Sequence, residues 1–234
     1  MTTTFSSSMR YPMPFTRVEI AALGVKHDRL QVLLIRRQEN PFKGRWALAG
    51  GVLRIDLDAD LQAAARRVAK ERFQTTNFEV QQFRAVGSSN RDGRGQAGWA
   101  LSVVYFGFIQ GDESELTAGK RVEALEWFDV DQLPSREKMA FDHSLLITEL
   151  TQWVRMRASM LDYVKGLVPS SFTLTKLQAL TEGVTGQRYN KSNFRRKLLD
   201  RELVEEVPGV IYRGRNRPAI AYRLRDGALT KGPA

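Results

Sequence analysis

The chain has 234 residues, of which 42% are hydrophobic and 26% are charged. These values are ordinary for globular proteins, so they exclude a largely disordered, collagen-like or coiled-coil chain and leave room for one large domain or two modest ones. The longest apolar stretch, residues 99–109, is about half the roughly 20 residues that a membrane-spanning helix needs, and the absence of cysteine excludes disulfides and zinc–thiolate sites. We therefore expect no membrane partner, no metal and no cofactor, and the lack of cysteine is compatible with a reducing compartment such as the cytoplasm.

The first 142 residues predict a mixed β-sheet with a helix packed on it. Residues 1–15 lack the basic start and apolar stretch of a secretory signal and are predicted to form a flexible tail. Apolar residues at helical spacing predict a helix over residues 60–73. Strands are predicted over residues 18–25, 31–36, 78–86, 99–109 and 124–128. This order indicates an α/β layered domain over residues 16–142.

The next segment predicts a single long helix. Leucine, valine, methionine and tryptophan residues recur at helical spacing from His143 to Val164. We expect residues 143–166 to connect the two parts of the chain, where this helix would either carry motion between them or pair with a second copy. A helix that only covers its own domain is the alternative.

Positive charge is concentrated in the last third of the chain. Residues 1–164 hold 22 Lys and Arg against 20 Asp and Glu, whereas residues 165–234 hold 14 against 6. A strongly basic segment beside a near-neutral domain is typical of a protein that binds phosphates of a nucleic acid. A solvated basic tail is the alternative, but the periodicity favours folded structure: Thr173 is placed to cap a helix with Leu174, Leu177 and Leu180 on one face.

A second helix in this region has the composition of a DNA-reading helix. Asn190 is placed to cap it, and Phe194, Leu198 and Leu199 are expected on its core face. Arg and Asn form bidentate hydrogen bonds with base edges, whereas Lys and Ser more often hold phosphates. The candidate DNA-binding residues on this helix are Lys191, Ser192, Asn193, Arg195, Arg196 and Lys197.

The chain then predicts a β-hairpin with a basic tip. A turn is expected at Pro208–Gly209, followed by strands over residues 210–212 and 219–224. The candidate DNA-binding residues at the tip are Arg213, Arg215, Asn216 and Arg217. Two helices and a basic hairpin describe a winged helix-turn-helix over residues 167–234, with double-stranded DNA as its partner. A solvated hairpin and a protein-interaction module are the alternatives.

Within the first domain, one segment resembles the Nudix domain around its box. The resemblance rests on Pro41–Phe42, Gly44–Leu48, Gly50–Gly51 and Ala64–Arg67. It aligns the three metal-binding glutamates of the family with Val68, Glu71 and Arg72, so only one carboxylate remains. Since Mg²⁺ requires several hard oxygen ligands, we expect no catalytic residue and no metal-assisted hydrolysis. Glu71 paired with Arg67 is the structural alternative, and Asp56, Asp58 and Asp60 suit either helix capping or a replacement metal cluster.

The Nudix cleft is nevertheless expected to bind a small molecule. Arg36, Arg37 and Arg54 could hold a diphosphate, the glycines would let the backbone approach closely, and aromatic rings could cover an apolar face, although the aromatics are also typical core residues. The candidate ligand-binding residues are Arg36, Arg37, Phe42, Trp46, Gly50, Gly51, Arg54 and Glu71.

Both halves together resemble the Nudix-related transcriptional regulators of the NrtR family, including its NadQ-type members. The motifs that carry this resemblance, beyond those above, are Asn90–Asp92 with Trp99, Ala140–His143, Phe172–Leu174, Asn193–Lys197 and Arg217–Ala219. The resemblance implies a dimeric repressor of genes for NAD biosynthesis or salvage, bound to a palindromic operator and controlled by ADP-ribose, with NAD or ATP as alternatives. A Nudix pyrophosphohydrolase with a basic nucleic-acid-binding appendage is the alternative function.

Overall fold

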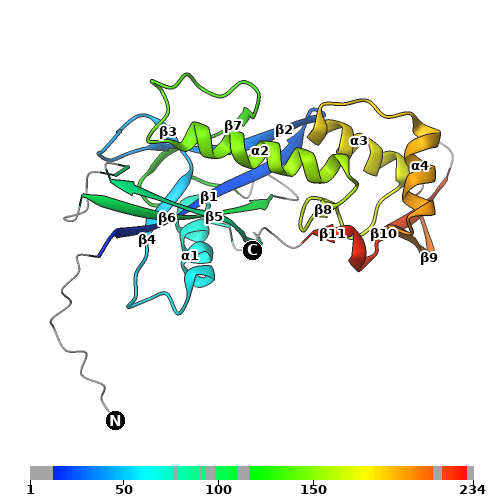
Figure 1. Cartoon of the computed structure of the whole chain (residues 1–234), viewed down its shortest axis with the longest axis horizontal. Helices are drawn as coiled ribbons and strands as arrows, with labels where there is room; N and C mark the ends of the chain where they lie inside the picture. Colours follow the sequence, from blue (N-terminus) through cyan, green and yellow to red (C-terminus); the bar gives the residue numbers. More distant parts are fainter. Residues whose placement is uncertain are drawn as a thin grey trace, which may run out of the picture.

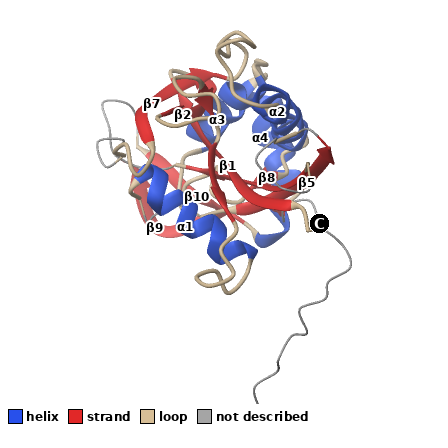
Figure 2. Ribbon diagram, turned by 90° about the vertical axis from the view of Figure 1, so that its left-hand side faces the viewer, coloured by secondary structure: helices blue, strands red, loops and turns tan. Residues whose placement is uncertain are grey.

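The chain folds around a seven-stranded mixed sheet (Figures 1 and 2). The computed structural model describes residues 13–75, 79–89, 91–92, 98–109, 116–212 and 218–230. The strands of the sheet are β1 (Phe15–Lys26), β2 (Arg29–Arg37), β3 (Trp46–Ala47), β4 (Ala49–Val52), β5 (Gln81–Ser89), β6 (Trp99–Phe108) and β7 (Val122–Asp129). The five predicted strands are therefore confirmed, and the short strands β3 and β4 are additional.

Strand β1 organises the sheet because it pairs with three other strands. It runs parallel to β6 and antiparallel to β2 and β4. Its alternating side chains separate two layers of core: Ile20 and Ala22 face helix α1 (Leu61–Phe73), whereas Ala21 and Leu23 face helix α2 (His143–Ser159). Helix α1 begins where predicted, since the Asp60 carboxylate accepts a hydrogen bond from the Ala63 N–H. The predicted α/β layered domain is confirmed.

Helix α2 is shorter than predicted. The sequence predicts one helix from His143 to Val164, but α2 ends at Ser159 and the chain reverses direction at Leu161, which has a φ of 61°. The residues that follow form strand β8 (Tyr163–Val164), which pairs in parallel with β11 (Leu229–Thr230) near the end of the chain. Tyr163 is fully buried, and its hydroxyl lies 2.9 Å from that of Thr181. These tertiary contacts outweigh the helical periodicity of the segment.

The remaining residues form a winged helix that packs against α2. Helix α3 (Leu174–Thr185) is capped by Thr173, and helix α4 (Lys191–Asp200) is capped by Asn190, as predicted. Strands β9 (Val204–Tyr212) and β10 (Ala219–Leu224) form the wing, and a short 3-10 helix (Asp226–Ala228) precedes β11. Buried residues of α2, α3 and α4 belong to one hydrophobic cluster, which joins the winged helix to one face of the large sheet.

Three local predictions are wrong. Pro208–Gly209 is not a turn that precedes a short strand: β9 continues through it, and the pairing with β10 shifts register there, which makes it a bulge with Gly209 at a φ of 74°. Leu199 is 49% exposed and lies outside the core. Strand β1 already begins at Phe15, inside the segment predicted as a tail, while residues 1–12 lie outside the described residues.

Within the described ranges, no helix combines the length and the apolar character that crossing a bilayer requires.

Candidate anion pocket and nucleic-acid interface

Two glycines of β4 form a wall between helix α1 and an arginine. A Cβ atom on Gly51 would lie 2.6 Å from Cγ2 of Val68 in α1, and a Cβ atom on Gly50 would lie 2.9 Å from the Arg17 guanidinium. Side chains at these positions would therefore displace the helix or the guanidinium. These contacts lie within the protein, and the close approach of this backbone to a ligand stays a prediction.

A small cavity opens on this wall and is strongly basic. Its volume is about 70 Å³, roughly that of two water molecules at about 30 Å³ each, so it fits one anionic group rather than a whole nucleotide. The side chains that give it charge are Arg17, Arg37, Arg72, Arg121 and Glu39. Four guanidinium groups and one carboxylate in the lining favour a phosphate group over a cation or an apolar group. Three of these arginines also pair with carboxylates: Arg17 with Asp92, Arg72 with Glu71 and Arg121 with Glu39.

Three of the eight predicted ligand-binding residues line this cavity: Arg37, Gly50 and Gly51. Arg37 is held in place by hydrogen bonds to the carbonyl oxygens of Pro41, at 2.8 Å, and Glu39, at 3.4 Å. Arg17, Arg72 and Arg121 were not predicted, because β1 supplies the first and the other two come from a helix end and a loop that only the fold brings together.

The other five predicted residues make contacts of their own. Arg36 pairs with Glu123 at 3.3 Å, and Arg54 pairs with Asp56. The Phe42 ring packs edge-on against Phe141 at 4.7 Å between centroids, and the Trp46 ring packs against Phe128 at 5.0 Å. None of these residues, nor Glu71, lines the cavity.

The retained carboxylate of the box is surrounded by arginine. One oxygen of Glu71 lies 3.3 Å from Arg67 and the other lies 3.4 Å from Arg72. Arg72 is buried, and it donates hydrogen bonds to the carbonyl oxygens of Gly50 and Lys120 at 3.1 and 3.0 Å. Burial lowers the pKa of the Arg72 guanidinium, although Glu71 opposes the shift. A cation thus occupies the position that aligns with a metal ligand.

The residues present therefore do not fit the magnesium ion that hydrolytic Nudix proteins use. Val68 packs on Gly51 and supplies no oxygen, and both oxygens of Glu71 already face guanidinium groups. Among the described residues, no group of three or more His, Cys, Asp or Glu side chains is arranged to hold a metal ion.

The acidic residues before α1 have structural partners. Asp58 accepts two hydrogen bonds from Arg67, at 2.7 and 2.8 Å, and a third from the Arg54 N–H at 2.8 Å. The hydrogen bond from Arg67 lowers the pKa of Asp58 in spite of burial. Asp60 caps α1 and Asp56 pairs with Arg54. Of the three acids, only Asp60 follows the capping interpretation, whereas Asp56 and Asp58 pair with arginines.

A buried polar cluster lies behind the wall of the cavity, and none of its residues is among the predicted ligand-binding residues. Arg91 donates two hydrogen bonds to Asp142, at 2.8 and 2.9 Å, one to Glu19 at 2.9 Å and one to Ser102. Burial alone would raise the pKa of Glu19, but His143, Arg91 and Arg17 outweigh burial and hold the pKa of Glu19 well below its usual value. Because Glu19 pairs with Gly50 in the sheet, this cluster braces the cavity from behind.

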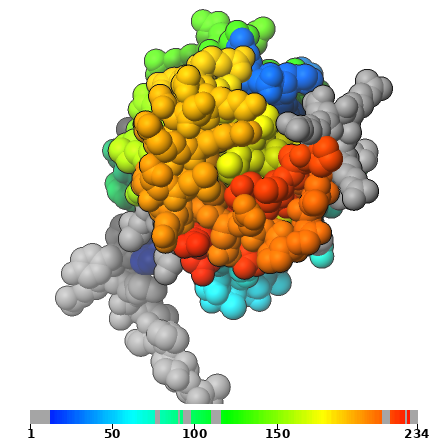
Figure 3. Space-filling view, turned by 90° about the vertical axis from the view of Figure 1, so that its right-hand side faces the viewer, coloured from blue at the N-terminus to red at the C-terminus, as the bar shows by residue number. Residues whose placement is uncertain are grey.

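Helix α4 presents a basic face to solvent. Phe194 and Leu198 are buried and fix the helix on the domain, which leaves its opposite side outward (Figure 3). The exposed predicted residues on this helix are Lys191, Ser192, Asn193, Arg196 and Lys197. Arg195 is half-buried and donates a hydrogen bond to the Thr175 hydroxyl at 3.1 Å, so it is tied to α3.

The wing is anchored beside this face. The Tyr212 hydroxyl donates a hydrogen bond to the Ser171 carbonyl at 3.0 Å, just before α3. Arg223 on β10 pairs with Glu205, and Arg225, just after β10, pairs with Glu202 at 3.0 Å and with Glu205 at 3.5 Å. The predicted tip residues Arg213, Arg215, Asn216 and Arg217 lie outside the described residues.

Two family descriptions match this chain. The NUDIX domain matches residues 16–150, and the NrtR DNA-binding winged helix domain matches residues 164–224. The two matches cover the large sheet with its helices and the winged helix, respectively.

Two characterised relatives share 32% identity with this chain. One is the ADPR responsive transcriptional repressor NtrR of Acinetobacter baylyi, aligned over 214 residues that cover 92% of this chain and 83% of the relative. The other is an ADP-ribose pyrophosphatase of Methanocaldococcus jannaschii, aligned over 134 residues that cover 57% of this chain and 73% of the relative.

Solved structures show the same architecture. Shewanella oneidensis NrtR complexed with a 27mer DNA matches with a TM-score of 0.70 at 25% identity, covering 91% of this chain and 94% of that chain. The NUDIX domain of the same protein complexed with ADP ribose matches with a TM-score of 0.55 at 25% identity, covering 64% of this chain and 94% of that chain.

Proposed function

This chain belongs to the NrtR-type regulators, in which a Nudix domain precedes a DNA-binding winged helix, and from this membership we propose that it is a transcriptional repressor controlled by ADP-ribose. In this proposal residues 16–142 sense the metabolite, residues 143–166 connect, and residues 167–234 bind the operator. The named relative with the same two-part architecture is an ADPR responsive repressor, which supports both parts of the assignment.

The observation that carries the DNA-binding half is the exposed basic face of α4. Asn193 and Arg196 lie within 3.4 Å of each other on this face, and both side chains suit hydrogen bonds to base edges. Lys191 and Lys197 flank them and suit phosphates. The tip residues Arg213, Arg215, Asn216 and Arg217 complete the proposed interface as contacts of the wing with the DNA backbone.

The basic cavity supports the second half of the proposal, which is that the Nudix domain binds ADP-ribose. ADP-ribose and NAD each contain a diphosphate, and Arg37, Gly50 and Gly51 are proposed to contact it together with Arg72 and Arg121. Both characterised relatives are named for ADP-ribose, and a related Nudix domain is known in complex with it, which favours ADP-ribose over NAD and ATP. Since cleavage of NAD at its nicotinamide bond yields ADP-ribose, genes of NAD biosynthesis or salvage are the proposed targets.

We further propose that the Nudix domain of this chain does not hydrolyse its ligand. The relative named as a pyrophosphatase shares only the shorter alignment, whereas the repressor aligns over nearly the whole chain. The pairing of Glu71 with Arg67 and Arg72 supports the same conclusion, because it leaves the box without an oxygen set for Mg²⁺.

Dimerisation and a palindromic operator are also part of the proposal. A two-fold dimer would present two α4 helices about one DNA turn, ~34 Å, apart on two half-sites. Because its target is genomic DNA, we propose that the protein acts in the cytoplasm.

A fluorescence-anisotropy titration tests this function. Labelled duplex from the region upstream of the gene is titrated with protein at low ionic strength, alone and with saturating ADP-ribose, NAD or ATP, and a shuffled duplex serves as the control. We expect preferential binding of the upstream duplex and an effect of ADP-ribose on the Kd of about fivefold or more.

Each outcome decides one part of the proposal. If neither duplex binds, the DNA-binding assignment is wrong. If the duplex binds and only NAD or ATP changes the Kd, the effector assignment is wrong while the repressor assignment stands.

A further inference from the structure

Helix α2 is fixed at its first residue to the wall of the anion cavity. His143 is buried, and its Nδ1 accepts a hydrogen bond of 2.9 Å from the Leu48 N–H, two residues before Gly50. Asp142, which precedes the helix, is held by two hydrogen bonds from Arg91. A change in the position of the wall therefore acts directly on the start of α2.

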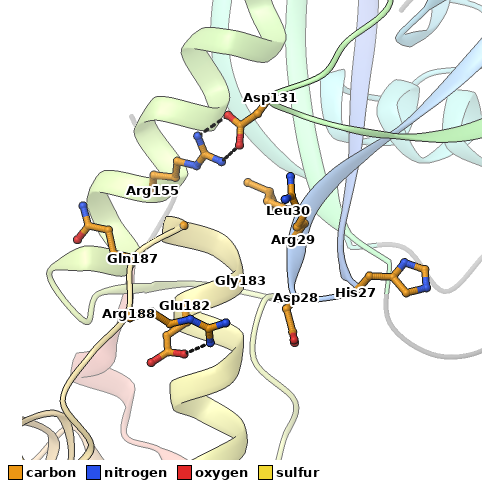
Figure 4. A pocket seen from close by; sticks show the side chains of 11 residues that line it. His27, Asp28, Arg29, Leu30, Asp131, Arg155, Glu182, Gly183, Gln187 and Arg188 are labelled. Atoms are coloured by element: carbon orange, nitrogen blue, oxygen red, sulfur yellow. Dashed lines mark hydrogen bonds and ion pairs between the residues drawn. The ribbon is translucent and has the colours of Figure 1, made fainter.

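The other half of α2 holds the winged helix. Arg155 donates a hydrogen bond of 3.0 Å from Nε to the Val184 carbonyl in the last turn of α3, and its two terminal nitrogens donate to Asp131 at 2.8 and 2.6 Å (Figure 4). Asp131 follows β7 and belongs to the Nudix domain. One guanidinium group thus joins the large sheet, α2 and α3.

Near Arg155, α3 contacts the β1–β2 hairpin at one point, and a cleft lies beside this contact. A Cβ atom on Gly183 would lie 3.0 Å from Val25 and 3.1 Å from the backbone of Asp28, so α3 touches the β1–β2 hairpin directly there. Beside this contact lies a cleft of about 460 Å³, which Arg155 also lines (Figure 4). The contact at Gly183 and the cleft therefore both lie at the junction between α3 and the Nudix domain.

Helix α4 is also tied to this unit. Arg201, immediately after α4, donates a hydrogen bond of 2.8 Å to the Met160 carbonyl at the end of α2. Since α2, α3 and α4 also share one hydrophobic cluster, a change in the angle of α3 carries α4 with it.

We propose that Arg155 is the positioning residue that couples the two domains: it sets the angle of α3 on the Nudix sheet, so that occupancy of the anion cavity alters the DNA-reading helix through α2 and Arg155. The inference rests on the proposed function, and it adds a residue that contacts neither the DNA-reading face nor the anion cavity. The bidentate bond to Asp131 has a defined geometry that a single ammonium group does not reproduce, so Lys is not equivalent to Arg here.

Hydrogen exchange measures this coupling without DNA. Amide exchange of residues 174–200 is compared with and without saturating ADP-ribose in the full-length wild-type protein, Arg155→Met, Arg155→Lys and Asp131→Asn, while calorimetry gives the ADP-ribose Kd of each. Arg157→Met is the matched control, because Arg157 lies on the same helix but pairs locally with Asp162 at 2.7 Å.

In the wild type and in Arg157→Met, we expect ADP-ribose to change the exchange rates of residues 174–200 by about fivefold or more. In Arg155→Met and Asp131→Asn, this response disappears while the ADP-ribose Kd stays within about twofold of the wild-type value, since neither residue lines the anion cavity. Arg155→Lys retains charge and shows a reduced response. Loss of coupling with unchanged ligand affinity separates a positioning role from a merely structural one.

Two results would overturn the inference in distinguishable ways. If Arg155→Met and Asp131→Asn transmit the effect as the wild type does, the role of Arg155 is refuted and the proposed function stands. If the wild-type protein does not bind ADP-ribose, or binds it without any response in residues 174–200, the proposed control by ADP-ribose fails and the inference fails with it. Should Arg155→Met not fold, Asp131→Asn decides the matter, because it keeps the bond from Arg155 to Val184.

Discussion

Replacing Asp58 with alanine tests whether the acidic loop beside the cavity is structural. The Asp58 side chain is 1% exposed and accepts three hydrogen bonds, two from Arg67 and one from the Arg54 N–H. Removing one partner of a buried ion pair costs about 3–5 kcal/mol. Because Arg67 keeps its contacts with Glu71 and the Val52 carbonyl, we expect the lower end, about 3 kcal/mol. For a chain of this size that loss corresponds to a fall in Tm of about 6–12 °C.

Urea unfolding and thermal melting, each with Mg²⁺ and with EDTA, measure this loss. Asp56→Ala is the matched control and is expected to behave as wild type, since Asp56 is exposed. The pKa of Asp58 is lowered in the folded protein, so its contribution is present above the unfolded pKa of about 3.9 and disappears as the pH falls through the folded value. The difference between wild type and Asp58→Ala therefore shrinks in acid. A Tm of Asp58→Ala equal to that of wild type, or a wild-type stability that EDTA lowers, would refute this reasoning.

Three further outcomes are expected. Arg196→Glu weakens duplex binding in anisotropy titrations by tenfold or more, which is about 1.4 kcal/mol. The control Arg66→Glu makes the same charge change on the exposed surface of α1 and leaves duplex binding near the wild-type value. Equal losses of binding in both variants would point to a non-specific charge effect. Glu71→Gln leaves the rate of ADP-ribose hydrolysis with Mg²⁺ at background, as in wild type, and Mg²⁺-dependent turnover that the substitution abolishes would show an active enzyme. Gly51→Ala lowers the free energy of unfolding in urea by about 1–3 kcal/mol, since its Cβ would lie 2.6 Å from Val68, and unchanged stability would contradict that packing.

Local chemistry was sufficient to predict where α1, α3 and α4 begin. Asp60, Thr173 and Asn190 each accept a hydrogen bond from a backbone N–H three residues later, so the start of each helix is encoded within one turn. Strand patterns were equally clear, because β1 alternates between two buried layers that differ in their partners. The basic face of α4 follows from its position opposite Phe194 and Leu198.

The features that sequence reasoning missed depend on contacts between distant segments. Arg91 joins Glu19, 72 positions away, to Asp142, 51 positions away, and no local pattern marks an arginine that will be buried. The same holds for the end of α2, where β8 pairs with β11 at the far end of the chain. The pair Pro208–Gly209 suits both a turn and a bulge, so the sequence predicts a turn where the structure has a bulge.

Control of DNA binding by ADP-ribose is best tested by calorimetry. ADP-ribose is titrated into the free protein and, separately, into the protein saturated with its upstream duplex. Coupling between two sites is reciprocal. We therefore expect DNA to change the Kd for ADP-ribose by the same factor by which ADP-ribose changes the Kd for DNA. Identical ADP-ribose affinities of the free and the DNA-bound protein would contradict the claim that occupancy of the Nudix domain controls the winged helix.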